Sequence, residues 1–299
     1  MFEFKAEQKK FKIGKVNVGG LPGERPTVLI GSIFYHKQKI VLDVNKGDFN
    51  REKAEELIKL QEEFSDKTGN PCMLDVIGAT PEAMRKALDF TAGITETPIV
   101  MDGTSPVVRV AGLEYVKESG LSSRVVYSSL TPEFKPEEVD KIREVGVESA
   151  ILLAYNIREF TTEGRVKTIK KLLPISSDAG VNKPLIDTCV LDVPSLGQAC
   201  KAIFLLKDEL GLPVGCGAHN AIGTWRGLKK KMGEQTLKPS VASSMAITAM
   251  VGADFILYGP IESASYVFPA VAMVDVAHSQ LLIEKGKKIG AEHPRYKVA

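Results

Sequence analysis

The stretch TVLIGSIF, residues 27–34, is a short apolar run rich in β-branched residues, and a longer amphipathic segment follows it. It is the first of eight such runs, and continuous hydrophobicity of this kind is typical of strands in a buried parallel sheet. The other seven are CMLDVIG (72–78), PIVMD (98–102), RVVYSS (124–129), SAILLAYN (149–156), KPLIDTCV (183–190), PVGCGA (213–218) and DFILYG (254–259). Eight strand–helix units without a break in composition predict one α/β domain over residues 1–299, a single (β/α)8 TIM barrel.

The segments between these runs carry helix signals. Thr80 followed by Pro81 is typical of an N-cap and a first helical residue. A helix predicted over 195–210 ends at Gly211, a residue type that commonly terminates helices in the left-handed conformation.

Two segments fall outside the eight units. Residues 11–18, FKIGKVNV, alternate apolar and polar side chains, so they predict a β-hairpin within an N-terminal extension of residues 1–26. We expect this hairpin to cap the bottom of the barrel, at the amino ends of the strands. Residues 222–238 predict a long loop on the opposite face, where barrels of this type hold their active sites.

The composition is that of an ordinary globular chain. Its 299 residues include 39 basic and 37 acidic side chains, and the formal net charge is +2. This balance gives no electrostatic reason to expect nucleic acid or an anionic membrane surface as a partner. No stretch reaches the ~18 uninterrupted apolar residues of a membrane span, and the four cysteines form no CxxC pair. We therefore expect a cytoplasmic protein without a membrane span.

Polar side chains gather where the predicted strands end. Because the carboxyl ends of barrel strands share one mouth, they predict a ring of carboxylates, carboxamides and hydroxyls there. Lysine and arginine are missing from these positions, so the ring suits a neutral heterocycle rich in hydrogen-bond donors rather than a phosphate. The histidines show neither HxH nor HExxH spacing, and we predict no protein-bound metal. The ring consists of Asp75, Asp102, Ser128, Asn156, Asp187, Asn220 and Tyr258.

Each of these side chains also has a structural interpretation, because an Asp at a strand end is often the N-cap of the next helix. Thr104 or Ser105 can cap the helix after Asp102, which frees that carboxylate. Asp192 is better placed than Asp187 to cap the helix that follows. Functional and structural interpretations both stay open for Asp75, Ser128, Asn156 and Asn220.

Four motifs resemble the family of the H subunit of tetrahydromethanopterin S-methyltransferase. They are LIGSIFY (29–35), SDKTGNPCMLDVIGATPEAM (65–84), PLIDTCVLDVPS (184–195) and LGLPVGCGAHN (210–220), and the resemblance runs across nearly the whole chain. That family includes methanogen subunits and free-standing bacterial relatives that use tetrahydrofolate. More distantly, the chain resembles methyltetrahydrofolate:corrinoid protein methyltransferases and dihydropteroate synthase, which are pterin-binding (β/α)8 barrels.

The resemblance implies a pterin site at the mouth of the barrel. In the wider pterin-binding family, acidic residues after strands 3 and 6 bind the aminopyrimidinone edge of the pterin; here these are Asp102 and Asp187. An Asn after strand 7 reaches N5, the atom that bears the methyl group, and here that is Asn220. The family often has another Asn after strand 4. This chain has Ser128 there, so that contact falls to Ser128, to Asn156 or to a water.

The resemblance also implies a reaction, in which a methyl group moves between N5 and the cobalt(I) of a corrinoid held on a partner protein. An amine anion is a very poor leaving group, so N5 needs a proton as the C–N bond breaks. Asn220 can accept a hydrogen bond from protonated N5 and so stabilise charge that is largest near the transition state. We expect a water linked to Asp75 to supply the proton, which makes Asn220 and Asp75 the predicted catalytic residues.

The predicted function is methyl exchange between a corrinoid protein and tetrahydrofolate, in a demethylation of the glycine betaine or methylamine type. The first alternative is the H subunit of a methanogen methyltransferase, with tetrahydromethanopterin as the methyl carrier. The second alternative is a non-catalytic subunit that docks a corrinoid protein. Dihydropteroate synthase chemistry is a weaker rival, because a pyrophosphate leaving group requires lysine or arginine at the strand ends. The resemblance further implies a homodimer.

Overall fold

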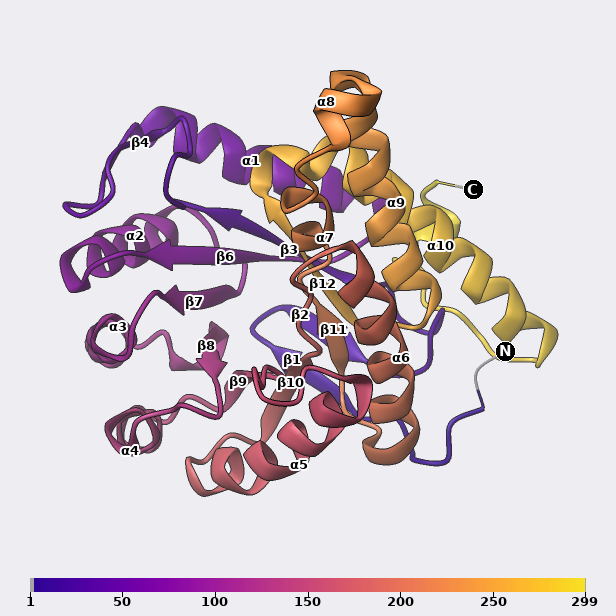
Figure 1. Cartoon of the computed structure of the whole chain (residues 1–299), viewed down its shortest axis with the longest axis horizontal. Coiled ribbons are helices and arrows are strands. Elements are labelled where there is room, and N and C mark those ends of the chain that lie inside the picture. Colours follow the sequence, from indigo (N-terminus) through magenta and orange to yellow (C-terminus); the bar gives the residue numbers. More distant parts are fainter. Residues whose placement is uncertain (1–2, 299) are drawn as a thin grey trace.

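The computed structural model describes residues 3–298, and within them eight parallel strands close into one barrel (Figure 1). Each strand overlaps one of the eight apolar runs, so the predicted TIM barrel is confirmed. In spatial order the strands are β3 (Val28–Ile33), β6 (Cys72–Gly78), β7 (Ile99–Gly103), β8 (Val125–Leu130), β9 (Ser149–Leu153), β10 (Lys183–Asp187), β11 (Val214–Cys216) and β12 (Phe255–Pro260), and β12 pairs with β3.

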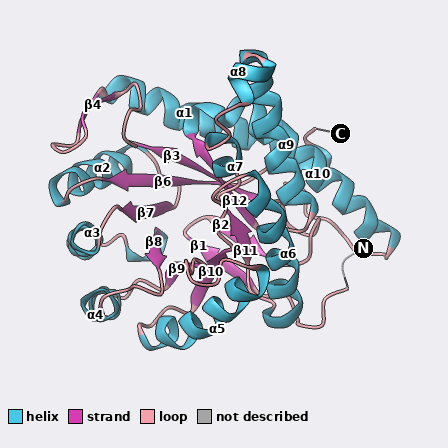
Figure 2. Cartoon of the chain, viewed as in Figure 1, coloured by secondary structure: helices cyan, strands magenta, loops and turns pink. Residues whose placement is uncertain are grey.

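Helices alternate with the barrel strands along the chain and cover the outside of the sheet (Figure 2). Thr80 caps the second helix by accepting a hydrogen bond from the Ala83 amide at 3.1 Å, and the sixth helix ends at Gly211, where φ is 64°, as the sequence predicts. The long helices are α1 (Arg51–Thr68), α2 (Pro81–Ile94), α3 (Pro106–Ser119), α4 (Pro136–Val145), α5 (Thr162–Asp178), α6 (Val193–Leu210), α9 (Leu237–Met250) and α10 (Ala264–Glu284).

The lower half of the barrel interior is apolar. Alternate residues of each strand point inward, and those nearest the amino ends form one buried cluster: Val28, Ile30, Met73, Val100, Val126, Ile151, Leu185 and Phe255. The hairpin of β1 (Lys10–Ile13) and β2 (Val16–Gly19) adds Ile13, Val16 and Val18 to the same cluster. The hairpin therefore caps the bottom of the barrel, as predicted.

Two connections differ from the predicted pattern. β4 (Val41–Asp43) and β5 (Asp48–Phe49) form a small antiparallel hairpin between β3 and α1, with strands too short to show a periodicity in the sequence. The predicted loop over 222–238 contains the short helix α8 (Leu228–Met232), whose Leu228 packs into the core. It follows α7 (His219–Gly223), the turn of helix directly after β11.

One helical segment of the described chain, Ile261–Glu284, is long and apolar enough to cross a membrane by length and composition. Its most apolar window has a mean hydropathy of 1.4, and 44% of that window is buried in the folded chain. The segment also contains Asp275, which is buried and accepts hydrogen bonds from Thr27 and Asn70. A helix packed against a barrel passes the same test of composition, so this is weak evidence for a span.

Candidate active site

The inward positions turn polar toward the carboxyl ends of the strands. Counting by twos from the apolar cluster, Met73 is followed by Asp75, Val100 by Asp102 and Leu185 by Asp187. The same alternation places Ser32 and Ser128 inside the barrel. Asp75 is 3% exposed and Asp187 is 8% exposed. The three aspartates and Ser128 of the predicted ring therefore line the upper layer of the barrel interior, which holds three largely buried carboxyl groups.

Asp75 is the deepest of the three. Ser32 on the neighbouring strand β3 donates a hydrogen bond from Oγ to Asp75 Oδ2 at 2.6 Å. The other oxygen, Oδ1, is buried and has no hydrogen-bond partner within residues 3–298. Burial raises the pKa of Asp75 well above its usual value, and the nearby charges of Asp102 and Asp187 raise it further. Asp75 therefore binds its proton more tightly than an exposed aspartate does.

Asp102 lies one pair of residues nearer the mouth, because Asp75 is opposite Val100 in the sheet. Burial raises its pKa to about 6, while the positive charge of Arg109 lowers it. Among the described residues, no hydrogen bond to the Asp102 carboxylate is present. A buried carboxylate without a donor is unusual, so this group is available to a ligand.

Asp187 is held by the main chain after its own strand. The Cys189 amide donates to Asp187 Oδ1 at 2.7 Å, and the Gly217 amide also donates to this carboxylate. Burial raises the pKa of Asp187 to about 6, and these two bonds and Arg165 oppose that rise. Asp102 and Asp187 both titrate near pH 6, and both are therefore mainly ionised at neutral pH.

Asn220 lies in α7, directly after β11. A Cβ on Gly217 would come within 3.2 Å of Asn220 Nδ2, so the missing side chain leaves space for the amide. Because Gly217 also donates to Asp187, this glycine brings Asn220 and Asp187 to the same side of the mouth. No hydrogen bond to the Asn220 side chain is found in the part of the chain that the structure describes.

The three remaining predicted residues differ in position. Tyr258 was wrongly placed in the ring: it points out of the barrel, packs against Phe268 of α10 and donates a hydrogen bond from Oη to Gln61 Oε1 at 2.6 Å. Ser128 is 7% exposed and lies opposite Asp102 in the sheet, so it belongs to the inner ring. Asn156 lies three residues beyond the end of β9, and its Oδ1 accepts a hydrogen bond from the Arg158 amide at 3.0 Å. Asn156 therefore stabilises its own loop, and a contact with a ligand stays a prediction.

The sequence analysis missed Ser32, Arg109 and Arg165. Ser32 could have been found from the strand period alone, because it follows Ile30 by two residues on β3. The two arginines start from helices, and their contacts with strand ends depend on the packing of helix against sheet. Within residues 3–298, no group of three or more His, Cys, Asp or Glu side chains has the arrangement of a metal site.

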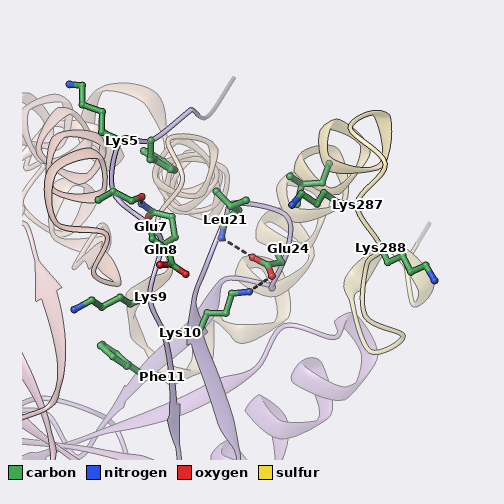
Figure 3. A pocket seen from close by; sticks show the side chains of 13 residues that line it. Lys5, Glu7, Gln8, Lys9, Lys10, Phe11, Leu21, Glu24, Lys287 and Lys288 are labelled. Carbon is green, nitrogen blue, oxygen red and sulfur yellow. Dashed lines mark hydrogen bonds and ion pairs between the residues drawn. The ribbon is translucent and has the colours of Figure 1, made fainter.

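A cavity of about 930 Å³ lies elsewhere, between the N-terminal arm and the end of α10 (Figure 3). Two of the lysines that line it already have acidic partners: Lys5 forms an ion pair with Asp208 at 2.9 Å, and Lys10 forms one with Glu24. None of the strand-end residues described above lines it. The convergent buried groups at the barrel mouth define the better candidate site.

A closed parallel barrel with buried acceptors and an amide at its mouth defines this protein as a TIM barrel whose candidate site lies at the carboxyl ends of the strands. The family model described as "Tetrahydromethanopterin S-methyltransferase MtrH subunit" matches residues 6–293. The chain belongs to this family, so the predicted resemblance is confirmed, and the chain is a methyltransferase by family.

Two relatives illustrate the match. The H subunit of tetrahydromethanopterin S-methyltransferase from Methanopyrus kandleri is 41% identical over 96% of this chain and 94% of its own length. The same protein from Methanothermobacter marburgensis is 39% identical over 100% of each chain.

Among solved structures, dihydropteroate synthase of Yersinia pestis with a pterine–sulfa conjugate superposes with a TM-score of 0.61 and 13% identity, over 91% of this chain and 100% of that chain. At this identity the likeness shows the fold alone.

Proposed function

We propose that this chain catalyses methyl transfer between N5 of a reduced pterin and a corrinoid carried by a partner protein. The carrying observation is that Asp102 and Asp187, two largely buried carboxylates, belong to one ring at the barrel mouth and have acceptor capacity that no described residue fills. A reduced pterin presents a 2-amino group and N3–H, which are donors that such carboxylates accept.

The residues of the mouth have complementary protonation states. Asp102 and Asp187, with a pKa of about 6 each, act as acceptors at neutral pH, whereas the pKa of Asp75 is raised well above its usual value, which favours its protonated form. Environments that separate the pKa values of neighbouring acids indicate which is acid and which is base. We assign Asp75 as the proton source for N5, acting through a water, and Asn220 as the acceptor that stabilises the protonated N5.

The bond changes agree with these roles. The corrinoid supplies cobalt(I), the nucleophile that takes the methyl group. The electron pair of the broken C–N bond stays on N5, so the proton that Asp75 provides leaves N5 as a neutral secondary amine. The Asn220 oxygen favours the protonated form of N5, which exists only on the way to transfer.

The partner has to reach the mouth, and the connections around it carry exposed apolar side chains. Exposed large hydrophobics occur after five of the barrel strands: Leu42, Val107, Ile157, Leu191, Val193, Trp225 and Met232. Exposed apolar side chains around a site can contribute to a protein interaction surface. We propose that the corrinoid protein docks on this rim.

The methyl carrier that we propose is tetrahydromethanopterin, because the two relatives described above carry it in their names. This favours the first alternative of the sequence analysis over the tetrahydrofolate and glycine betaine or methylamine function, which stays unconfirmed. Isothermal titration with 5-methyltetrahydromethanopterin and 5-methyltetrahydrofolate separates the two. Heat with the first and none with the second supports the proposal. Heat with neither overturns it and favours a non-catalytic docking subunit.

We also propose a homodimer and a cytoplasmic location. The helices α9 and α10 pack on each other and expose Ile247, Met250 and Met273, which are 51%, 39% and 63% accessible. The four cysteines are free and buried, which is typical of proteins from reducing compartments. Sedimentation velocity of Ile247→Asp/Met273→Asp is expected to give a monomer. A wild-type protein that is already monomeric contradicts the dimer.

A further inference from the structure

Two largely buried arginines bind the main chain directly after two of the site aspartates. Arg109 of α3 donates from Nη1 to the Gly103 carbonyl at 2.9 Å, and Arg165 of α5 donates from Nε to the Thr188 carbonyl at 2.7 Å. In both cases the acceptor belongs to the residue that follows the aspartate. The same contact thus occurs twice, on β7 and on β10, which are not neighbours in the sheet.

Arg109 is fixed by more than this carbonyl. Its guanidinium forms an ion pair with the buried Glu138 at 2.6 Å, and its Nε donates to Tyr127 Oη at 2.9 Å. A Cβ on Gly103 would lie 2.4 Å from Arg109 Cγ, so only glycine lets the arginine stem pass this close to the strand end. The positive charge lowers the pKa of Asp102 against the effect of burial.

Arg165 is 1% exposed and is held in the same manner. Its Nη2 donates to the Cys189 carbonyl at 3.2 Å, and its guanidinium lies 3.9 Å from the centre of the Phe160 ring. The Cys189 amide in turn donates to the Asp187 carboxylate. Arg165 therefore fixes the turn that orients Asp187, and its charge lowers the pKa of that carboxyl.

Asp75 provides the contrast within the same ring. Its surroundings are the Ser32 hydroxyl and the carboxyl groups of Asp102 and Asp187, and no arginine is among the groups that act on it. The acids differ in their hydrogen bonds and also in this nearby charge, and a guanidinium favours the charged form of a carboxyl group.

We infer that Arg109 and Arg165 are positioning residues of the methyl-transfer site, which fix the main chain after Asp102 and Asp187 and place a positive charge beside each of these two aspartates. The inference rests on the proposed function for the identity of the ligand. The arrangement of the arginines and aspartates does not depend on the proposed function, because it is present in the protein without ligand. The role is indirect, since the hydrogen bonds of both guanidinium groups go to other partners than the two aspartates.

Other groups also act on these carboxyls, and they constrain the experiment. Asp187 is affected by the other carboxyl groups of the ring as well as by nearby thiols, so a change at Arg165 has to be measured on Asp187 itself. The titratable and charged groups around Asp187 are Asp75, Asp102, Arg165, Cys189 and Cys216. Those around Asp102 are Asp75, Asp187 and Arg109.

The test uses Arg165→Met, Arg165→Lys and the double variant Arg109→Met/Glu138→Gln, which avoids leaving a buried unpaired carboxylate. Arg124→Met is the matched control, because Arg124 is also buried and donates to main-chain carbonyls, those of Thr95 and Ala92, but at the amino end of β8. Circular dichroism checks folding. The ¹³C shifts of the aspartate carboxyl carbons are followed against pH in the protein without ligand.

We expect the midpoint of Asp187 to rise by about one pH unit or more in Arg165→Met. The Arg109 double variant moves Asp102 in the same way, and Arg165→Lys restores part of the effect. Unchanged midpoints in folded variants, or an equal shift in Arg124→Met, overturn the inference.

A second measurement distinguishes failure of this inference from failure of the proposed function. In Arg165→Met, a midpoint of Asp187 raised by about one unit roughly halves its ionised fraction at pH 7, so the dissociation constant of 5-methyltetrahydromethanopterin is expected to increase about twofold at pH 7 and to recover at pH 8.5. A wild-type protein that binds no pterin contradicts the proposed function. The carboxyl titration still decides the role of the arginines in that case.

Discussion

The lower half of the barrel interior is filled by apolar side chains from the strands and the hairpin β1–β2, whereas the upper half holds Asp75, Asp102 and Asp187. Burial of the apolar side chains in the lower half stabilises the folded state, because it removes their surface from water. Burial of the acids in the upper half destabilises the folded state, because it disfavours their charged forms. The apolar packing at the bottom of the barrel therefore offsets the cost of burying the acids at the mouth, where they can accept hydrogen bonds from a ligand.

The largest expected effect is on the free energy of unfolding, and it comes from a substitution at the bottom of the barrel. Ile13 is fully buried in the lower cluster, so Ile13→Ala is expected to lower the free energy of unfolding by about 2–5 kcal/mol. Urea denaturation measures this effect. Ile157→Ala, at a residue 75% exposed beside the mouth, is the matched control and is expected to change stability by less than about 0.5 kcal/mol. Pterin affinity stays unchanged in both; a large loss of affinity in Ile13→Ala contradicts the separation of the two ends.

At the mouth, Asn220→Ala is expected to slow methyl transfer to the corrinoid protein on the order of 10²-fold, because it removes a contact made mainly in the transition state. Pterin affinity changes only a few-fold. Stopped-flow absorbance of the corrinoid measures the transfer rate. Asn17→Ala is the control, since that amide is exposed on β2, in the hairpin at the opposite end of the barrel. Turnover equal to that of the wild type in Asn220→Ala refutes the assignment to N5.

Asp102→Asn is expected to raise stability at pH 8 while it weakens pterin binding. The pKa of Asp102 rises from 3.8 to about 6 on folding, so the folded protein binds this proton more tightly than the unfolded chain. Holding the ionised form in the fold therefore costs free energy above pH 6, and the cost disappears below pH 4. The gain is at most about 1–3 kcal/mol at pH 8 and close to zero at pH 4. Thermal unfolding at the two pH values measures it, and a variant less stable than the wild type at pH 8 contradicts the desolvation argument.

The weakest effect concerns the pH dependence of binding in the wild type. Asp102 and Asp187 accept from the pterin only when ionised, and their pKa values of about 6 place the loss of acceptors just below neutrality. We expect the dissociation constant to increase about tenfold or more between pH 7 and pH 5. Titration calorimetry across this range measures it. Constant affinity down to pH 5 would mean that the ligand does not use these carboxylates.

Much of the fold could be predicted because each strand is a local signal. Runs such as CMLDVIG and KPLIDTCV are apolar without interruption, and caps such as Thr80 and Gly211 mark where helices begin and end. The hairpin β4–β5 and the helix α8 were missed, since their few residues carry no period and form only against the body of the barrel. The same limit applies to Arg109 and Arg165, whose partners lie on other elements.

The order of residues alone was enough to establish the barrel, the polar ring at its mouth and the family, because strand periodicity and contiguous motifs are written along the chain. It could not reveal that the pKa of Asp75 is raised well above its usual value while those of Asp102 and Asp187 stay at about 6. That difference depends on which side chains meet in the folded barrel: a hydroxyl and two carboxyls at Asp75, and a guanidinium near each of the others. Electrostatic energy depends on distance in space and on exclusion of water, and both arise only when the chain is folded.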